Sequence, residues 1–408
     1  MKVHERFLRY AKYDTQSDPE SKTYPSTAKQ ITLLKDLKQE LDDLGVDVKM
    51  DNFGYVIGKI KANINHEVPT VAFIAHVDTS PDASGKDISP RTIYDYDGKD
   101  IILNEEIGIT LSPDTFKNLK EHVGEDLIVT DGLTLLGADD KAGVAEIMTF
   151  VDYLHKHPNV LHGDITIVFT PDEEVGHGTK YIDIDNIDAD FAYTLDGSYV
   201  GELAYENFNA AGATVIINGK SVHPGSAKHK MLNSLMVAME FDTLLPTHMR
   251  PEITEKYEGF NHLHNMAGNC EKTVMKYIIR NHDKKIFAKQ KEDFLNASAF
   301  LNKKYGKDTC YLEIEDSYYN MREKLEDNET IINIAMNAIK NQHIHPVTEP
   351  IRGGTDGARL TYMGLPCPNL GTGGYNFHGP YEYLSINEME KAVEILKDIN
   401  NQIVSKEG

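Results

Sequence analysis

Three short segments of the chain are apolar at nearly every position: residues 71–75, 165–169 and 191–195. Each is too short for a typical helix and is rich in residues that favour strands, a pattern typical of central strands covered on both faces. Helical segments lie between them, such as residues 142–155. This alternation predicts an α/β fold with a mixed, largely parallel central sheet flanked by helices.

Amphipathic helices are predicted near both ends of the chain. After Pro25 and Ser26, apolar side chains recur at helical spacing, and Gly45 stands where a helix C-terminal cap belongs. These side chains are Ile31, Leu34, Leu37, Leu41 and Leu44. Residues 329–340 and 387–403 also have a helical pattern, and they return the chain to the domain that holds the three strands.

The pattern changes between about residues 210 and 320. Its segments favour strand, helix, strand, strand, helix and strand in that order: 214–217, 232–245, 260–268, 273–280, a Lys-rich helical segment, and 311–318. This order resembles the split βαβ arrangement. We therefore predict a discontinuous main domain, residues 1–209 and 321–408, that carries an inserted α+β domain, residues 210–320.

The charge balance excludes some classes of partner. The chain has 42 Lys and Arg against 64 Asp and Glu, a net charge of −22, and such a surface repels nucleic acid and anionic membranes. No segment approaches the roughly 18 apolar residues of a membrane span, and residues 1–6 lack the apolar core of a signal peptide. We expect a cytoplasmic protein that acts on small molecules.

Cysteine usage points to a reducing compartment. The three cysteines, Cys270, Cys310 and Cys367, are far apart and form no Cys-x-x-Cys pair. This spacing argues against a disulfide framework and against a thiolate zinc site.

Potential ligands follow each of the three apolar segments. His76 and Asp78 follow the first, Glu173 and Glu174 follow the second, and Asp196 follows the third. Sites in open α/β sheets form at the carboxyl ends of strands, so these side chains are expected to meet. One such placement could be a solvated turn, but three together favour a functional site.

Two other segments add candidates. Asp139 and Asp140 stand between glycines just before a helix, where either acid could simply cap the helix and Asp139 could also bridge two cations. His378 stands in a glycine-rich loop and could be incidental, since the chain has 17 histidines. A set of two histidines and three carboxylates without cysteine suits a dinuclear hydrolytic site for Zn²⁺, Co²⁺ or Mn²⁺. It is too rich in nitrogen for a dedicated Ca²⁺ site.

The combined motifs resemble those of the dizinc exopeptidases related to carboxypeptidase G and aminoacylase. They occur in that family's order over nearly the whole chain: His76-Val-Asp78-Thr, Gly137-Ala-Asp-Asp-Lys-Ala-Gly143, Pro171-Asp-Glu-Glu-Val-Gly176, Leu195-Asp196-Gly, Ser221-Val-His-Pro-Gly225, Arg352-Gly-Gly-Thr-Asp356 and the late His378. The segments 137–143 and 376–379 most resemble the tripeptide aminopeptidases of that family.

The resemblance implies two Zn²⁺ ions, with Co²⁺ or Mn²⁺ as possible substitutes. Its ligand set has His76 and Asp196 on one ion, Glu174 and His378 on the other, and Asp139 between them. It also implies that Glu173 is the general base toward a water shared by the metals, that Asp78 orients His76, and that the Asp139–Asp140 peptide is cis.

The implied activity is release of the N-terminal residue from tripeptides. His223 would contact the reacting carbonyl or a carboxylate, and Arg280 or Arg352 would hold the peptide's free C-terminus, because arginine pairs bidentately with carboxylates. The inserted domain would act as a lid and could mediate a homodimer. A dipeptidase, carboxypeptidase or amide deacylase with the same metal site, and a metal-dependent binding protein without turnover, remain alternatives.

Overall fold

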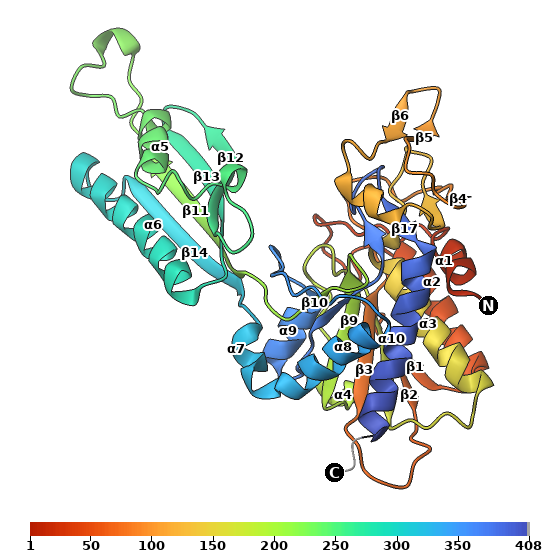
Figure 1. Ribbon diagram of the computed structural model, residues 1–408. Helices are drawn as coiled ribbons and strands as arrows, with labels where there is room; N and C mark the ends of the chain where they lie inside the picture. Colours follow the sequence, from red (N-terminus) through yellow and green to blue (C-terminus); the bar gives the residue numbers. More distant parts are fainter. Residues whose placement is uncertain (406–408) are drawn as a thin grey trace. The chain divides into compact units, whose positions relative to one another are not determined.

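The structure is a computed structural model that describes residues 1–405 (Figure 1). The chain divides into two compact units. The larger comprises residues 1–205, 324–348 and 355–408, and the smaller comprises residues 206–323 and 349–354. Among the helices within residues 1–405, none combines the length and apolar character that a membrane crossing requires.

The larger unit is built on a seven-stranded sheet. Its strands, in spatial order, are β1 (Asp47–Met50), β2 (Val56–Ile60), β8 (Ile165–Thr170), β3 (Val71–His76), β9 (Phe191–Gly197), β15 (Asn369–Gly371) and β10 (Leu203–Ala204). The four central strands, β8, β3, β9 and β15, are parallel, whereas β2 joins β8, and β10 joins β15, in antiparallel pairs. The predicted mixed, largely parallel sheet is confirmed.

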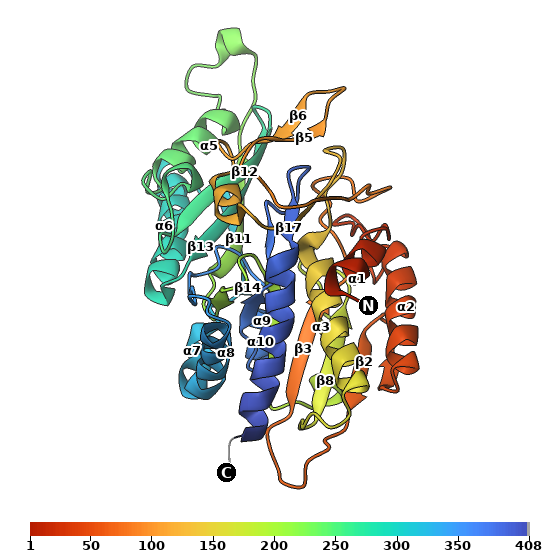
Figure 2. The same cartoon turned by 45° about the vertical axis from the view of Figure 1, so that its right-hand side comes forward.

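Helices cover both faces of the central strands, which explains why these strands are apolar on both faces. On one face, Phe73 of β3 packs edge-on against Phe150 of α3 (Ala138–Lys156), with ring centroids 5.5 Å apart. On the other, Ala72 and Ile74 belong to a buried cluster with Leu360 of α9 (Asp356–Met363). α10 (Ile386–Ser405) lies beside α3, as Figure 2 shows.

The remaining helices of this unit pack around that framework. α1 (Val3–Tyr10) contacts α3, α2 (Lys29–Asp43) lies on β1 and β2, and α8 (Glu329–Asn341) lies against α10. The sequence pattern located α2, α8 and α10 to within a few residues of their ends, because each has one continuous apolar stripe.

A second, four-stranded sheet in the larger unit was not predicted. Its strands, in spatial order, are β16 (Gly374–Tyr375), β17 (Tyr383–Ser385), β7 (Leu127–Val129) and β4 (Arg91–Ile93). Between β4 and β7 in the sequence come a hairpin, formed by β5 (Ile101–Asn104) and β6 (Ile109–Leu111), and the 3₁₀ helix η1 (Lys117–His122). Strands of two or three residues are too short to show a period of alternation, so the hydrophobic pattern could not reveal them.

The smaller unit has the predicted β-α-β-β-α-β order. Its antiparallel sheet has the spatial order β12 (Phe260–Gly268), β13 (Lys272–Asn281), β11 (Asn209–Asn218) and β14 (Cys310–Tyr318). α5 (Ser234–Thr243) and α6 (Lys284–Tyr305) pack on the sheet, and side chains such as Val215, Phe241, Met275 and Phe294 form their common core. The short elements α4 (Ile184–Ile187), α7 (Arg322–Leu325), η2 (Pro224–Ser226), η3 (Pro251–Ile253) and η4 (Glu326–Asn328) complete the chain.

The smaller unit begins and ends a few residues outside the predicted range 210–320, and it includes one further stretch. Residues 349–354 were assigned to the main domain, but they belong to the smaller unit. The reason is local bonding: the Ile351 N–H donates to the Glu206 carbonyl at 2.9 Å, and the Arg352 guanidinium donates to the carbonyls of Lys256 and Glu258 at 2.6 and 2.8 Å.

The contact between α3 and β9 makes a stability prediction. A Cβ at Gly143 would press into the Leu195 carbonyl oxygen, which β9 holds in place. We expect Gly143→Ala to lower the free energy of unfolding by about 1–3 kcal/mol, the usual cost of overpacking, as measured by thermal and urea unfolding. Gly379→Ala is the matched control, because open space surrounds that position. Equal stability of both variants would contradict this packing.

Candidate metal centre

Three neighbouring strands deliver ligand candidates to one edge of the sheet. His76 is the last residue of β3, Asp196 lies near the end of β9, and Glu173 and Glu174 follow β8. Because β8, β3 and β9 are adjacent and parallel, their carboxyl ends coincide. The start of α3 adds Asp139 from the side.

Asp139 lies between two histidines. Its Oδ1 is 2.9 Å from His76 Nε2, and its Oδ2 is 3.1 Å from His378 Nε2. His76 Nε2 is also 3.3 Å from Asp196 Oδ1, and His378 Nε2 is 3.0 Å from Glu174 Oε2. Each oxygen of Asp139 therefore faces a different pair, His76 with Asp196 and His378 with Glu174.

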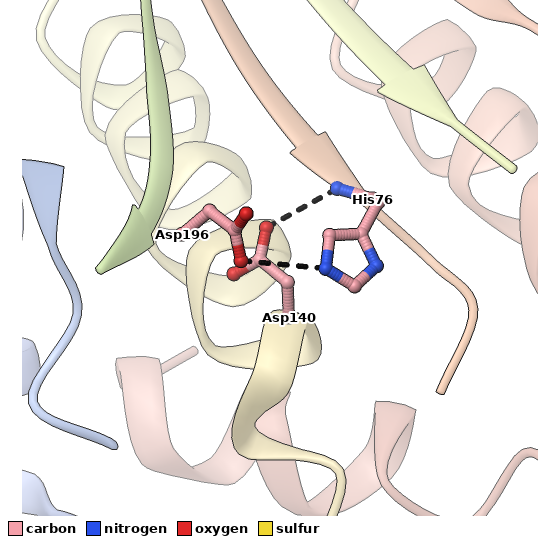
Figure 3. Close-up of side chains that lie close together, drawn as sticks. All are labelled: His76, Asp140 and Asp196. Carbon is pink, nitrogen blue, oxygen red and sulfur yellow. Dashed lines mark hydrogen bonds and ion pairs between the residues drawn. The ribbon is translucent and has the colours of Figure 1, made fainter. Parts of the chain in front are cut away.

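Asp140 has a different function from its neighbour. Its Oδ2 accepts a hydrogen bond from the His76 backbone N–H at 3.1 Å, and its Oδ1 accepts from the Gly143 N–H at 3.2 Å. Figure 3 shows Asp140 beneath the backbone of His76, while the imidazole reaches Asp196. Asp140 thus holds the end of β3 against α3. The Asp139–Asp140 peptide is cis, as expected.

Asp78 fixes both His76 and the acidic loop after β8. His76 Nδ1 lies 3.1 Å from the Asp78 carbonyl and 3.3 Å from its Oδ1, so Nδ1 donates to Asp78 and Nε2 is left to face Asp139. The fully buried Asp78 carboxylate also accepts the backbone N–H groups of Glu173 at 3.0 Å and Glu174 at 3.2 Å. One carboxylate therefore sets the positions of three candidate site residues.

The electrostatics show how crowded the acids are. Burial, together with the charge on Asp139, raises the pKa of Asp196 to about 7 and that of Glu174 to about 8. Burial, followed by the charge on Asp196, raises the pKa of Glu173 well above its usual value. Hydrogen bonds to Asp139 and Glu174 raise the pKa of His378 to about 11. Bound protons offset the negative charge of these closely spaced carboxylates, and bound cations would do the same.

The donor set fits a pair of divalent cations. Carboxylate and imidazole donors without thiolate are the ligands that Zn²⁺, Co²⁺ and Mn²⁺ share. Oε1 of Glu174 is buried and has no hydrogen-bond donor among residues 1–405, which leaves it available to a cation. Ligand atoms of His76, Asp139 and Glu174 all lie within 4.8 Å of one another, as do those of His76, Asp140 and Asp196.

Comparison with known proteins identifies the family of this chain. Residues 130–402 match the model of peptidase family M20/M25/M40, and proteins named peptidase T are similar over nearly the full length. One from Clostridium perfringens (strain 13 / Type A) is 54% identical over 98% of both chains. One from Bacillus subtilis (strain 168) is 51% identical, again over 98% of both. This chain belongs to peptidase family M20/M25/M40. It is therefore a peptidase.

Solved structures of peptidases share the fold. The aminopeptidase PepT from Bacillus cereus matches with a TM-score of 0.79 at 24% identity, covering 99% of this chain and 98% of the other. A tripeptidase from Staphylococcus aureus matches with a TM-score of 0.80 at 23% identity and the same coverage. A dinuclear metal-binding M20 peptidase from Bacillus subtilis matches with a TM-score of 0.65 at 13% identity, over 98% of both chains.

The sequence patterns gave no sign of Glu382, an acid that supports this cluster. Glu382 is buried, and its carboxylate accepts the backbone N–H groups of Leu136 at 2.6 Å, Gly137 at 2.9 Å and Asp139 at 3.1 Å. It thereby fixes the loop that carries Asp139. Glu382 follows no predicted strand and belongs to no recognisable spacing, so only its place four residues after His378 could have drawn attention to it.

The three predicted substrate contacts belong to the smaller unit and are not part of the cluster in the larger unit. His223 is exposed, and its Nδ1 accepts from the Gly225 N–H at 3.2 Å. Arg280 is half-buried; it donates to the carbonyls of Ala211 and Ile279, and its guanidinium stacks over Tyr318. Arg352 stacks over Phe208 in addition to its carbonyl contacts. The roles of these residues stay predictions.

The different roles of Asp139 and Asp140 can be tested by mutation. We expect Asp139→Asn to weaken Zn²⁺ binding by well over about tenfold, since it removes a charge that faces both histidines. Asp140→Asn should bind nearly as much metal, because its amide oxygen still accepts one of the two backbone N–H groups. Metal content after dialysis against graded chelator checks both variants. Greater metal loss from Asp140→Asn than from Asp139→Asn would reverse the assignment.

Proposed function

We propose that this protein is an aminopeptidase that releases the N-terminal residue of tripeptides with the help of two divalent cations, Zn²⁺ in the first instance. The observation that carries the proposal is the bridging geometry of Asp139, whose two oxygens face separate histidine–carboxylate pairs. The names peptidase T and tripeptidase among its relatives and structural neighbours support the substrate class.

The ligands divide into two sets in this proposal. His76 and Asp196 would hold one ion, Glu174 and His378 the other, and Asp139 both. When bound, such a pair polarises the peptide carbonyl and lowers the pKa of a water toward neutrality. Asp78, through its contact with His76 Nδ1, keeps the Nε2 lone pair directed to its ion.

Glu173 is the proposed general base and acid. It adjoins Glu174 in the turn that follows β8, and the Glu174 carboxylate faces His378, so one carboxylate can bind an ion while its neighbour faces the substrate. Glu173 would take a proton from the attacking water and deliver it to the leaving amine. Its partial burial and raised pKa suit a group that must both accept and release a proton.

Recognition of the peptide ends is assigned to the smaller unit. His223 and Arg280 are the candidates for the reacting carbonyl and the free C-terminal carboxylate. Arg352 is a further candidate for the carboxylate, which would share this guanidinium with the carbonyls of Thr254, Lys256 and Glu258 that it already binds.

The role of Glu173 has a direct test. Glu173→Gln keeps the shape of the side chain but cannot accept the proton, so kcat should fall by about 10²–10⁴-fold. Metal content, measured by mass spectrometry, should stay at the wild-type level. Loss of metal together with activity would indicate that Glu173 is a ligand and that Glu174 is the base.

The substrate class is tested with matched di-, tri- and tetrapeptides and Zn²⁺-loaded protein, with the products identified by mass. We expect release of the N-terminal residue, fastest from the tripeptide. Release of the C-terminal residue, or a preference for dipeptides, would instead indicate a carboxypeptidase or a dipeptidase with the same metal centre. Cleavage of N-acyl amino acids alone would indicate a deacylase.

A further inference from the structure

The residue before the two glutamates has an unusual backbone. Asp172 lies between the end of β8 and Glu173, is fully buried, and has a φ of +61°. Residues other than glycine rarely adopt this left-handed backbone conformation, although Asp and Asn tolerate it best. The Asp172 carbonyl accepts from the His177 N–H at 2.9 Å, and the Glu173 carbonyl accepts from Gly176, so the loop is a compact turn.

The Asp172 side chain binds a segment from a distant part of the sequence. Its carboxylate accepts hydrogen bonds from the Ser26 N–H at 2.6 Å, from the Ser26 hydroxyl and from Gln30 Nε2 at 2.7 Å. In return, Gln30 Oε1 accepts from the Asp172 N–H at 3.1 Å. Gln30 is fully buried as well. These contacts form a closed network of Ser26, Gln30 and Asp172, all within the larger unit.

The network and Asp78 hold the same short segment from two directions. Asp78 accepts the N–H groups of Glu173 and Glu174, while Ser26 and Gln30 fix the residue immediately before them. Fixing is needed because the carboxylates of Glu174 and Asp139 both lie against His378 Nε2, at 3.0 and 3.1 Å, so that like charges crowd one position. A change of backbone angle at residue 172 would rotate both glutamates away from their positions.

We propose that Asp172, held by Ser26 and Gln30, is a positioning residue for Glu173 and Glu174. It contacts neither substrate nor metal; it sets the backbone from which both carboxylates project. The segment around residues 26–30 thereby becomes part of the active-site support. The catalytic part of this inference rests on the proposed function, whereas the effect on ligand geometry does not.

A charge swap separates positioning from general stability. In Asp172→Asn, an N–H₂ group replaces the carboxylate oxygen that accepted from Gln30 Nε2, so two donors face each other. Flipping the Gln30 amide does not help, because its N–H₂ group would then face the backbone N–H of residue 172. One buried donor is left unpaired in either case. Asp172→Asn combined with Gln30→Glu restores complementarity, because both oxygens of the carboxylate at position 30 can accept a hydrogen bond. Asn also keeps the left-handed backbone accessible.

We expect Asp172→Asn, fully loaded with Zn²⁺, to lower kcat by about 10–100-fold, the usual effect of a misplaced catalytic group. KM should change by less than about threefold, and the swap should recover most of kcat. Asp188→Asn is the control, because Asp188 also has a positive φ but its carboxylate hydrogen-bonds only the surface residue Lys59 among the contacts that the structure describes. Wild-type kcat in Asp172→Asn, or a swap that restores melting temperature but not kcat, would overturn the proposal.

A second readout keeps this inference distinct from the proposed function. Zn²⁺ dissociation and amide hydrogen exchange at residues 173 and 174 can be measured without any substrate. Both should be at least about tenfold faster in Asp172→Asn than in the wild type. If the wild type cleaves no tripeptide yet these rates rise and the swap lowers them, the proposed function fails and the positioning role stands. Unchanged rates would overturn the positioning role.

Discussion

Like charges repel strongly in a buried site, and this constraint governs the rest of the metal centre. Asp139, Glu174 and Asp196 lie close to one another around two imidazoles, at a position where burial penalises each ionised carboxylate. Such a group keeps one geometry only if the backbone that carries it cannot relax. The neighbouring polar groups supply that rigidity.

Buried acids that accept backbone N–H groups recur around the cluster. Asp78 holds the loop after β8, Asp140 holds the end of β3, and Glu382 holds the start of α3. Asp172 holds the same loop from its other side. Each of these four carboxylates accepts at least one main-chain N–H group and so helps to shape the site. Asp139, Glu174 and Asp196 instead face the Nε2 atoms of the two histidines.

The sequence reveals most of the fold and most of the cluster, but not its supports. Long apolar segments locate β3, β8 and β9, and the parallel order then brings His76, Glu174 and Asp196 together. Asp139 and Asp140 could not be told apart by spacing, since each precedes the same helix; only the direction of each side chain separates them. Glu382 escapes detection because its partners are main-chain groups, which leave no pattern in side-chain identity. Asp172 escapes detection because its partners, Ser26 and Gln30, lie 146 and 142 residues away along the chain.

The chain re-enters the smaller unit at residues 349–354, and this limits how that unit can be exchanged between related proteins. A domain made of one continuous segment could be exchanged as a single piece. The smaller unit, however, also contains residues 349–354, and Arg352 in this stretch hydrogen-bonds the loop at residues 254–258. That stretch runs directly into Thr355, the N-cap of α9, and Asp356, which accepts a hydrogen bond from Thr170 of β8. Recombination at the two obvious boundaries would therefore mismatch residues 349–354. Functional chimaeras require both segments from the same parent.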